Sequence, residues 1–367
     1  MRKIVQIYML FIFVVLMGIS CHNKKQDRIE VKTISIEEFQ NNMINIYDVV
    51  KNIKIIPIET DSTVLIGNVK DICFYGEYIY LLDDMTASIL KIDMKDGRCV
   101  KKICNKGNGP NEYIRPAAIK SDSSWIYLLD MPMRQLIFYN HELEAQKTIR
   151  LPVSAQDFEC VNNGFLLYNA DSSPNANKLI YIDRKGNVKN NFFPCTEFNK
   201  SGIYNWGRER NFSINNYQIL FSEPYSNTIY IWENNHPKLK YQLSFGNLTT
   251  PNRTNINNYN IFEDFSYAIC MDFFNPDDFL IISFIYKNQR YYCFSNLLTD
   301  EKKMGVVSDE KNDFPFFPRW QNGNTLIGFV YYKDIKNIIN IKDRIVSKNN
   351  NFTIGDDYMP FLVFFTI

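Results

Sequence analysis

A short apolar run recurs six times along this chain of 367 residues. The runs begin at Ile79, Ile126, Phe165, Gln218, Phe279 and Thr325. The first two have the same sequence, IYLLD, and successive starts lie 39 to 61 residues apart. Repeats of about 40 to 50 residues are typical of β-propeller blades, in which each repeat forms one small sheet. This spacing constrains the fold more strongly than any other feature of the sequence.

Three further β-rich stretches accompany each run. In the first repeat they lie at residues 69–74, 89–93 and 99–103, with a Lys-Asp-Gly turn at residues 95–97. Short β-branched and aromatic runs between Gly, Asn and Asp turns are signals of strands and hairpins. A lone four-stranded sheet cannot bury both of its faces, whereas six such sheets packed around an axis can. The sequence therefore predicts an all-β fold, a six-bladed β-propeller of four-stranded blades over residues 51–367.

The sixth repeat departs from this pattern. Its run is followed by residues 333–348, where the isoleucines are spaced more like those of a short helix. The chain then ends on a strong strand signal at residues 361–365, and a further strand-like run lies far upstream at residues 53–58. We expect this N-terminal strand to complete the last blade and close the ring, because closure removes an exposed sheet edge.

Residues 1–21 have the organisation of a bacterial signal peptide. A basic start precedes residues 4–19, which are apolar apart from Gln6 and too short for a membrane span of about 20 residues. The segment ends in Gly18-Ile19-Ser20-Cys21, which resembles the lipoprotein cleavage box with Gly18 where Leu is usual. We expect Cys21 to be the lipidated residue; the alternative is an uncleaved anchor helix.

Residues 22–50 are mostly polar and are interpreted as a tether between the lipid and the propeller. Both alternatives for the N-terminus place the propeller outside the cytoplasm, in the cell envelope, with membrane contact only through the lipid anchor. No acidic run follows Cys21, so the sequence leaves open the outer or inner membrane and a periplasmic or surface-facing position.

Composition excludes several classes of function. The 41 Lys and Arg nearly balance the 40 Asp and Glu, so we expect no nucleic-acid partner. Only three His are present, at positions 22, 141 and 236, and no Gly-x-Ser-x-Gly motif occurs, which disfavours a zinc site or a catalytic triad. Paired acids such as Asp83 and Asp84 are interpreted as solvated turn residues. No cofactor and no metal are expected.

The cysteines also favour a structural interpretation. Seven follow Cys21 at irregular spacing, which is not the pattern of a disulfide framework. Cys73, Cys160 and Cys270 fall on the predicted innermost strands. We expect them to be small buried side chains, because unpaired Cys is often buried.

A glycine-rich segment between the first two repeats carries a family resemblance. Its sequence is Gly107-Asn108-Gly109-Pro110-Asn111-Glu112-Tyr113. With residues 57–60 and the closing strand it resembles the six-bladed β-propeller lipoproteins of Bacteroidota, whose typical segment has Gly where this chain has Asn111. The resemblance covers roughly residues 50–367. It implies an NHL- or TolB-like propeller that binds proteins, peptides or glycans, and it implies no catalytic motif.

Two connections in each blade, from the second to the third strand and from the last strand to the next blade, open on the same face of a propeller. The connections between blades are rich in aromatic, Arg and acidic residues, which suit a sugar or peptide ligand by stacking and polar orientation. The candidate ligand-binding residues are Glu112, Tyr113, Arg115, Trp206, Arg208, Arg210, Glu263, Asp264, Arg319 and Trp320. The alternative is that they hold neighbouring blades together through salt bridges.

We therefore expect a lipid-anchored, non-enzymatic propeller that binds a glycan, a peptide or a partner protein at this loop-rich face. The alternative is a propeller hydrolase or lyase with a channel metal or an Arg/Tyr site. A cluster of carboxylates facing the channel would favour the enzyme, because such a cluster can hold a metal ion.

Overall fold

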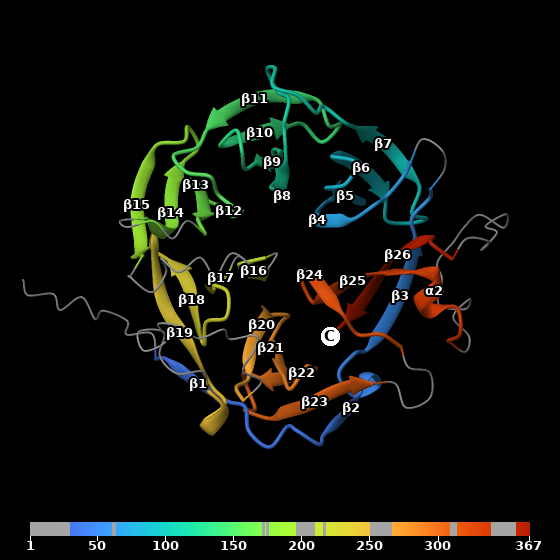
Figure 1. The fold of residues 1–367 in the computed structure, drawn as a ribbon, viewed down its shortest axis with the longest axis vertical. Coiled ribbons are helices and arrows are strands. Elements are labelled where there is room, and N and C mark those ends of the chain that lie inside the picture. Colours follow the sequence, from blue (N-terminus) through green and yellow to red (C-terminus); the bar gives the residue numbers. More distant parts are fainter. Residues whose placement is uncertain are drawn as a thin grey trace, which may run out of the picture. The chain divides into compact units, whose positions relative to one another are not determined.

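Six antiparallel sheets surround a central axis in the computed structural model, which describes residues 30–60, 64–170, 173, 176–195, 210–215, 218–249, 266–308, 314–338 and 357–367 (Figure 1). The chain divides into two compact units, Met1–Val31 and Lys32–Ile367, and the sheets belong to the second. Each sheet is one blade built on four strands, which follow sequence order from the axis outward except in the last blade, whose fourth strand comes from the N-terminal side. The predicted six-bladed propeller is confirmed.

The six apolar runs are the second strands of the blades. The innermost strands are β4 (Val69–Tyr75), β8 (Pro116–Ser121), β12 (Asp157–Val161), β16 (Phe212–Asn215), β20 (Ile269–Phe274) and β24 (Pro318–Asn322). The second strands are β5 (Tyr78–Asp83), β9 (Ile126–Asp130), β13 (Gly164–Tyr168), β17 (Gln218–Phe221), β21 (Phe279–Tyr286) and β25 (Thr325–Tyr331). They are largely buried because each lies between two strands of its own blade and two neighbouring blades.

The outer half of each blade is more exposed. The third strands are β6 (Ser88–Asp93), β10 (Gln135–Tyr139), β14 (Asn177–Asp183), β18 (Thr228–Glu233), β22 (Gln289–Asn296) and β26 (Pro360–Thr366). The fourth strands are β7 (Cys99–Ile103), β11 (Ala145–Arg150), β15 (Val188–Pro194), β19 (His236–Ser244), β23 (Lys302–Ser308) and β3 (Asn52–Pro57). The described helices are short: η1 (Ile46–Asp48), η3 (Gly246–Leu248) and α2 (Tyr332–Ile335).

The apolar core lies between blades. One cluster joins Tyr80 of the first blade to Ile119 and Leu128 of the second, and another joins Leu129 to Phe165 of the third. The last and first blades share a cluster in which Ile56 and Trp320 meet Leu81. Each blade is therefore stabilised by its neighbours rather than by a core of its own.

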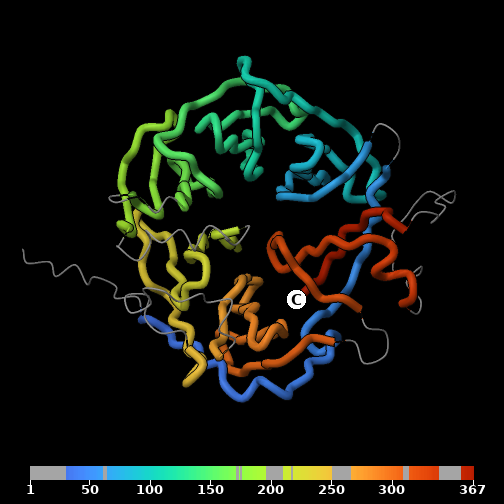
Figure 2. Tube along the Cα trace, in the orientation of Figure 1, coloured from blue at the N-terminus to red at the C-terminus, as the bar shows by residue number. Residues whose placement is uncertain are grey.

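Strand β3 closes the ring, as predicted. It pairs antiparallel with β26, with Pro57 opposite Phe361 and Asn52 opposite Thr366, and so supplies the outer strand of the last blade. Figure 2 shows this N-terminal strand in blue beside the red C-terminal strand. The closure depends on hydrogen bonds and packing alone, because no covalent bond joins the two ends.

Residues 32–48 differ from the tether expected over residues 22–50. Strand β1 (Lys32–Ser35) adds in parallel to β19, and β2 (Met43–Asn45) adds in parallel to β23, so two blades have five strands. An outer strand has an unpaired edge, and these short strands cover it. The apolar side chains of Ile34 and Ile44 are buried as a result.

Two aspartates at the ends of second strands accept hydrogen bonds from the backbone of the segments that lead into the same blades. Asp83 is fully buried and accepts hydrogen bonds from the backbone N–H groups of Gly67 (2.7 Å) and Asn68 (3.1 Å). Asp130 is equally buried and accepts from the N–H groups of Ile114 (3.0 Å) and Arg115 (3.1 Å). The interpretation of Asp83 as a solvated turn residue is therefore wrong, because its carboxylate satisfies backbone donors inside the fold.

We expect the substitution Gly97→Ala to weaken ring closure. Gly97 has φ +78°, and a Cβ there would lie 1.6 Å from the carbonyl oxygen of Pro57 in β3. The free energy of unfolding should fall by about 2 to 4 kcal/mol, from backbone strain plus the clash. Gly76→Ala is the matched control, because Gly76 also has a positive φ (+59°) but no atom within 4 Å of its Cβ position. Equal losses in urea denaturation of the two variants would contradict this role for Gly97.

Candidate functional site

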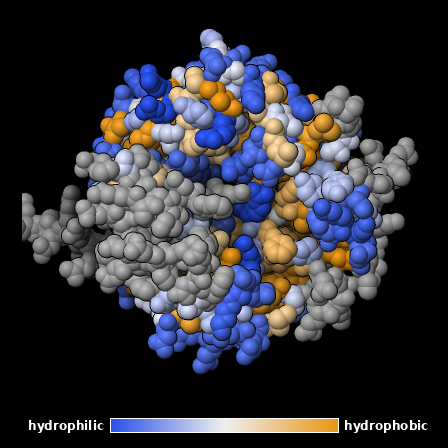
Figure 3. Space-filling model, viewed as in Figure 1, coloured by the Kyte–Doolittle hydropathy of each residue, from blue (hydrophilic) through white to orange (hydrophobic). Residues whose placement is uncertain are grey.

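A cavity of about 320 Å³ lies where the innermost strands converge. Five of the six blades contribute to its lining, which comprises Asp71, Ile72, Cys73, Phe74, Lys120, Ser121, Glu159, Arg210, Phe212, Ile214, Asn215, Trp320, Gln321, Asn322 and Gly323. Phe74, Ser121 and Asn322 lie at or next to the last residues of their strands, so this channel cavity extends to the end where the first strand of each blade turns into the second. Figure 3 shows that hydrophilic residues reach the middle of the ring on the face in view.

The centre of the channel cavity wall is a buried ion cluster. The Lys120 Nζ lies 2.9 Å from Asp71 Oδ2 and 3.9 Å from Asp157 Oδ1, so three inner strands meet there. Asp71 Oδ2 also accepts from the Ile119 N–H at 3.0 Å. Burial by itself lowers the pKa of Lys120, but the charges of Asp71, Asp157 and Glu159 outweigh burial and raise it above its ordinary value. Lys120 is therefore charged at every physiological pH.

Burial raises the pKa of two carboxyl groups of β12, whereas by itself it lowers the pKa of Lys120. The pKa of Asp157 is raised by burial, although Lys120 and the Asn211 N–H, which donates to its Oδ2 at 2.6 Å, both act to lower it. Burial raises the pKa of Glu159 from 4.5 to about 7, against the lowering effect of Lys120. Near neutral pH, Glu159 is therefore partly protonated.

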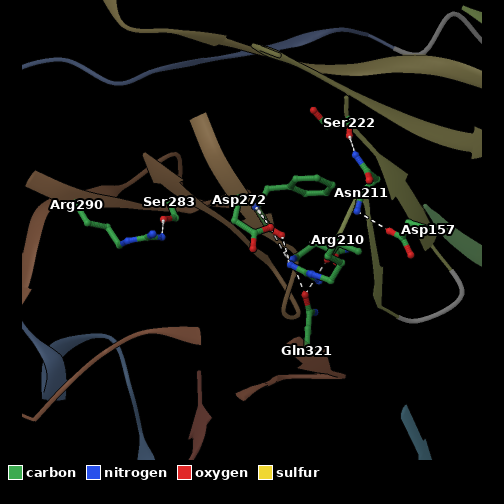
Figure 4. A network of polar contacts seen from close by, with 11 residues as sticks. Asp157, Arg210, Asn211, Ser222, Asp272, Ser283, Arg290 and Gln321 are labelled. Atoms are coloured by element: carbon green, nitrogen blue, oxygen red, sulfur yellow. Dashed lines mark hydrogen bonds and ion pairs between the residues drawn. The ribbon is translucent and has the colours of Figure 1, made fainter. Parts of the chain in front are cut away.

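Arg210 lies at the same wall, just before β16. Its Nη2 donates to Asp272 Oδ1 at 3.1 Å and to the Phe273 carbonyl at 2.8 Å, and its guanidinium stacks on Phe274 with 4.5 Å to the ring centroid (Figure 4). Its Nε is buried without a hydrogen-bond partner. An unsatisfied buried donor is unfavourable unless a ligand or water accepts from it.

Amide and hydroxyl groups fix the neighbouring strands. Gln321 Oε1 accepts from Ser213 Oγ at 2.9 Å and from the Asn275 N–H at 3.0 Å, and Ser213 Oγ also donates to Asn275 Oδ1 at 2.6 Å. The Asn211 Nδ2 donates to the Ser222 carbonyl at 3.2 Å (Figure 4). This network joins three blades and positions Arg210 and Gln321 at the channel cavity.

The arrangement can bind a small polar ligand with an apolar part. The wall combines charged groups with Phe212, Ile214 and Trp320, as binding sites for small molecules commonly do. Within the described residues no set of three or more His, Cys, Asp or Glu side chains is arranged to hold a metal ion. In the carboxylate cluster the Lys120 ammonium occupies the position between Asp71 and Asp157 that a cation would otherwise take.

Two predicted binding residues, Glu112 and Tyr113, lie in the glycine-rich segment and Arg115 lies just after it; all three contact the protein itself. Tyr113 is fully buried, and its hydroxyl donates to the Ala87 carbonyl at 2.8 Å. Glu112 Oε2 accepts from the Gly109 N–H at 2.6 Å. Arg115 is exposed, and its backbone N–H is held by Asp130. These contacts hold the segment itself in place, and Asn111 has a positive φ (61°), a conformation that Gly adopts most readily.

The structure brings two other candidates together at the channel cavity, Arg210 and Trp320. Arg319 lies at the bulge between Pro318 and Trp320, with its guanidinium 4.5 Å from the Trp320 ring centroid, and does not line the cavity. The candidates Trp206, Arg208, Glu263 and Asp264, and the proposed lipidation site Cys21, lie outside the described residues.

Asp71, Lys120 and Glu159 were not among the residues predicted to bind a ligand. Each is a charged residue inside a short, otherwise mostly apolar stretch that was correctly predicted as an innermost strand. A charged side chain at such a position must face the axis or be paired, because burial of an isolated charge is costly. That signal was present in the sequence. Cys73 and Cys270 are buried on these strands as expected, and Cys160 is partly buried.

Comparison with known proteins identifies the family and agrees with the fold. The chain belongs to the family described as a domain of unknown function (DUF4934), which matches residues 31–358. No curated protein matches the chain. The fold expected from the resemblance to Bacteroidota propellers is thus confirmed, and the family description names no activity.

Two solved structures from Bacteroides are similar to this chain. One is a protein of Bacteroides fragilis NCTC 9343 described as exported, with a TM-score of 0.75 and 17% identity, over 92% of this chain and 99% of that one. The other is a member of the DUF4221 family from Bacteroides vulgatus ATCC 8482, with a TM-score of 0.52 and 13% identity, over 87% and 96%. At these identities the likeness concerns the fold alone.

The described part of the chain contains no helix with the length and apolar character needed to cross a bilayer.

The raised pKa of Glu159 predicts a specific pH dependence of stability. Between pH 4.5 and about 7 the folded state holds a proton that the unfolded chain has lost, so the free energy of unfolding falls as the pH rises through this range. Glu159→Gln removes this effect. The free energy of unfolding of the variant minus that of the wild type should therefore increase by roughly 1 to 3 kcal/mol from pH 5 to pH 8. Urea denaturation at each pH measures this difference.

The control is Glu59→Gln, at an exposed position whose side chain makes no described hydrogen bond or ion pair. Its stability should run parallel to the wild type at every pH. Parallel curves for Glu159→Gln would contradict the assignment of a shifted pKa to Glu159.

Proposed function

We propose that this chain is a propeller of the cell envelope that binds a small glycan or peptide ligand in its channel cavity and performs no chemistry on it. The observation that supports this most directly is the convergence of charged, amide and aromatic side chains from five blades on one cavity of about 320 Å³. A cavity of this size suits a small molecule or the end of a longer one.

The proposal moves the expected site from the loop-rich face to the axis. Phe74, Asn322 and Gly323 place one side of the cavity at the turns between first and second strands. Arg210, which leads into β16 from the connection between the third and fourth blades, lines it as well. A ligand in the cavity would therefore contact the start or the end of most inner strands, while a partner protein would be restricted to the rim.

We further propose that the propeller is lipid-anchored outside the cytoplasm. The signal-like residues 1–21 with Cys21 support this, as does the similar Bacteroides fragilis protein described as exported. Export through a lipoprotein pathway would leave the acylated Cys21 as the first residue and the propeller free in the periplasm or at the surface.

If the ligand binds in the channel cavity, a bulky side chain at the mouth of the cavity should abolish the thermal shift that the ligand causes. The full-length chain is screened by thermal shift against host and plant oligosaccharides, peptidoglycan fragments, Ca²⁺ and EDTA, since a ligand of the native state raises the melting temperature. Asn322→Trp, at an exposed position of the cavity lining, should abolish the shift. Ser123→Trp, an exposed turn residue outside the lining, should keep it.

Each result of the screen discriminates between alternatives. A shift that survives Asn322→Trp would place the ligand on the loop-rich face instead. A large fall in melting temperature with EDTA would favour the metal-dependent hydrolase or lyase.

Lipid anchoring predicts that Cys21→Ala changes the state of the protein in cells. The wild type should fractionate with membranes and carry an acyl mass on Cys21 in mass spectrometry. The variant should lose the acyl mass, and Cys104→Ala, at an exposed cysteine of the propeller, is the control that should retain it. A wild-type protein without acylation would contradict the proposal.

A further inference from the structure

Glu159 has one carboxylate oxygen that the protein leaves without a partner. The residue is only 5% exposed, and it lines the channel cavity. Its Oε1 accepts from the Cys160 N–H at 2.8 Å. Among the described residues, none donates a hydrogen bond to Oε2 or forms an ion pair with it. An acceptor of this kind, on a largely buried side chain at the wall of a cavity, is open to a donor from a ligand or from solvent.

The charges around the channel cavity are unbalanced. Among the residues that the structure describes, four carboxyl groups lie at its wall or against it, those of Asp71, Asp157, Glu159 and Asp272, and two cations, Lys120 and Arg210. Lys120 is nearest Asp71, and Arg210 is paired with Asp272 at 3.1 Å. Glu159 is therefore the one of these four carboxyl groups that forms no ion pair with a described cation. Burial of a surplus negative charge is unfavourable until a proton or a further cation neutralises it.

We propose that the channel cavity recognises the primary ammonium group of a small ligand, with Glu159 Oε2 as the accepting atom. This inference rests on the proposed function of the cavity as a binding site and specifies the chemistry of its ligand. The ammonium supplies both the missing donor and the missing positive charge, and a charge-assisted hydrogen bond to a buried carboxylate is among the stronger polar contacts.

A second group at the wall restricts the ligand further. The Nε of Arg210 is a buried donor without an acceptor, so it suits an oxygen atom of the same ligand. Trp320 and Phe212 offer apolar surface for the body of the molecule. Amino sugars and aminoacyl compounds both combine a primary ammonium with oxygen acceptors at this size, and the experiment separates these two sources.

Binding of an ammonium is linked to the proton on Glu159. The titratable and charged groups that face Glu159 are Asp71 and Cys73 of β4, Lys120 of β8, Asp157 and Cys160 of β12, and Arg210 before β16. With a pKa of about 7, Glu159 is protonated in a large fraction of molecules at pH 6. The ligand ammonium replaces that proton, so the affinity for the ligand should rise several-fold from pH 6 to pH 7. On average, each binding event should release less than one proton.

The test is isothermal titration calorimetry of the full-length chain with two matched pairs of compounds. D-glucosamine is compared with D-glucose, and L-alaninamide with L-lactamide; each pair differs chiefly by the amine. We expect an amine to bind and its neutral counterpart to bind at least tenfold more weakly. Binding of glucosamine alone would identify an amino sugar as the source, and binding of alaninamide alone an aminoacyl compound. Titrations at pH 7 in phosphate and in MOPS, whose enthalpies of ionisation differ, should give different heats because the buffer takes up the released proton.

The variant Glu159→Gln should weaken amine binding at least tenfold and abolish the dependence on buffer, while Glu59→Gln should change neither. Neutral compounds that bind as tightly as the amines would overturn the ammonium assignment and leave the cavity as a binding site. Absence of binding by all four compounds would also overturn it. If, in addition, ligands found by thermal shift still bind to Asn322→Trp, the cavity itself fails as the site.

Discussion

Closure of the ring is the constraint on which the rest of the structure depends. A single four-stranded blade has two apolar faces and no core of its own, so each blade is stable only between two neighbours. The pairing of β3 with β26 provides the last blade with its outer strand and gives the first and last blades a shared apolar cluster. The close approach of Gly97 to Pro57 belongs to the same junction. The loss of any part of this junction would expose two blade faces together.

Closure also creates the polar centre of the molecule. Six inner strands directed at one axis bring side chains that are remote in sequence, such as those of Asp71 and Gln321, to the wall of one cavity. Charged residues at this axis must therefore neutralise one another, as Lys120 and Asp71 do. Glu159 and the Nε of Arg210, both at the cavity wall, are among the described groups that the protein's own contacts leave incomplete. A ligand that supplies the missing hydrogen-bond partners of such groups can gain binding free energy there.

Much of the fold could be predicted from residue pattern, and little of the site. The repeated runs such as IYLLD identified the second strands, and residues 53–58 identified the closing strand, because burial between blades imposes a local apolar pattern. The parallel addition of β1 and β2 left no comparable signal, since the two strands are only four and three residues long. Asp83 looked like a surface turn residue because its backbone donors, Gly67 and Asn68, lie some 15 residues earlier in the sequence.

The sequence by itself determined the number of blades, the strands within each and the closing strand, because these follow from local hydrophobicity and turn chemistry. It also marked Arg210 and Trp320 as candidates, since aromatic and cationic residues are conspicuous between blades. Only the tertiary structure decided that Asp71, Lys120 and Glu159 form one cluster and that Tyr113 is buried. The physical reason is that charge pairing and cavity formation depend on distances between strands remote in sequence, which the curvature of the closed ring alone sets.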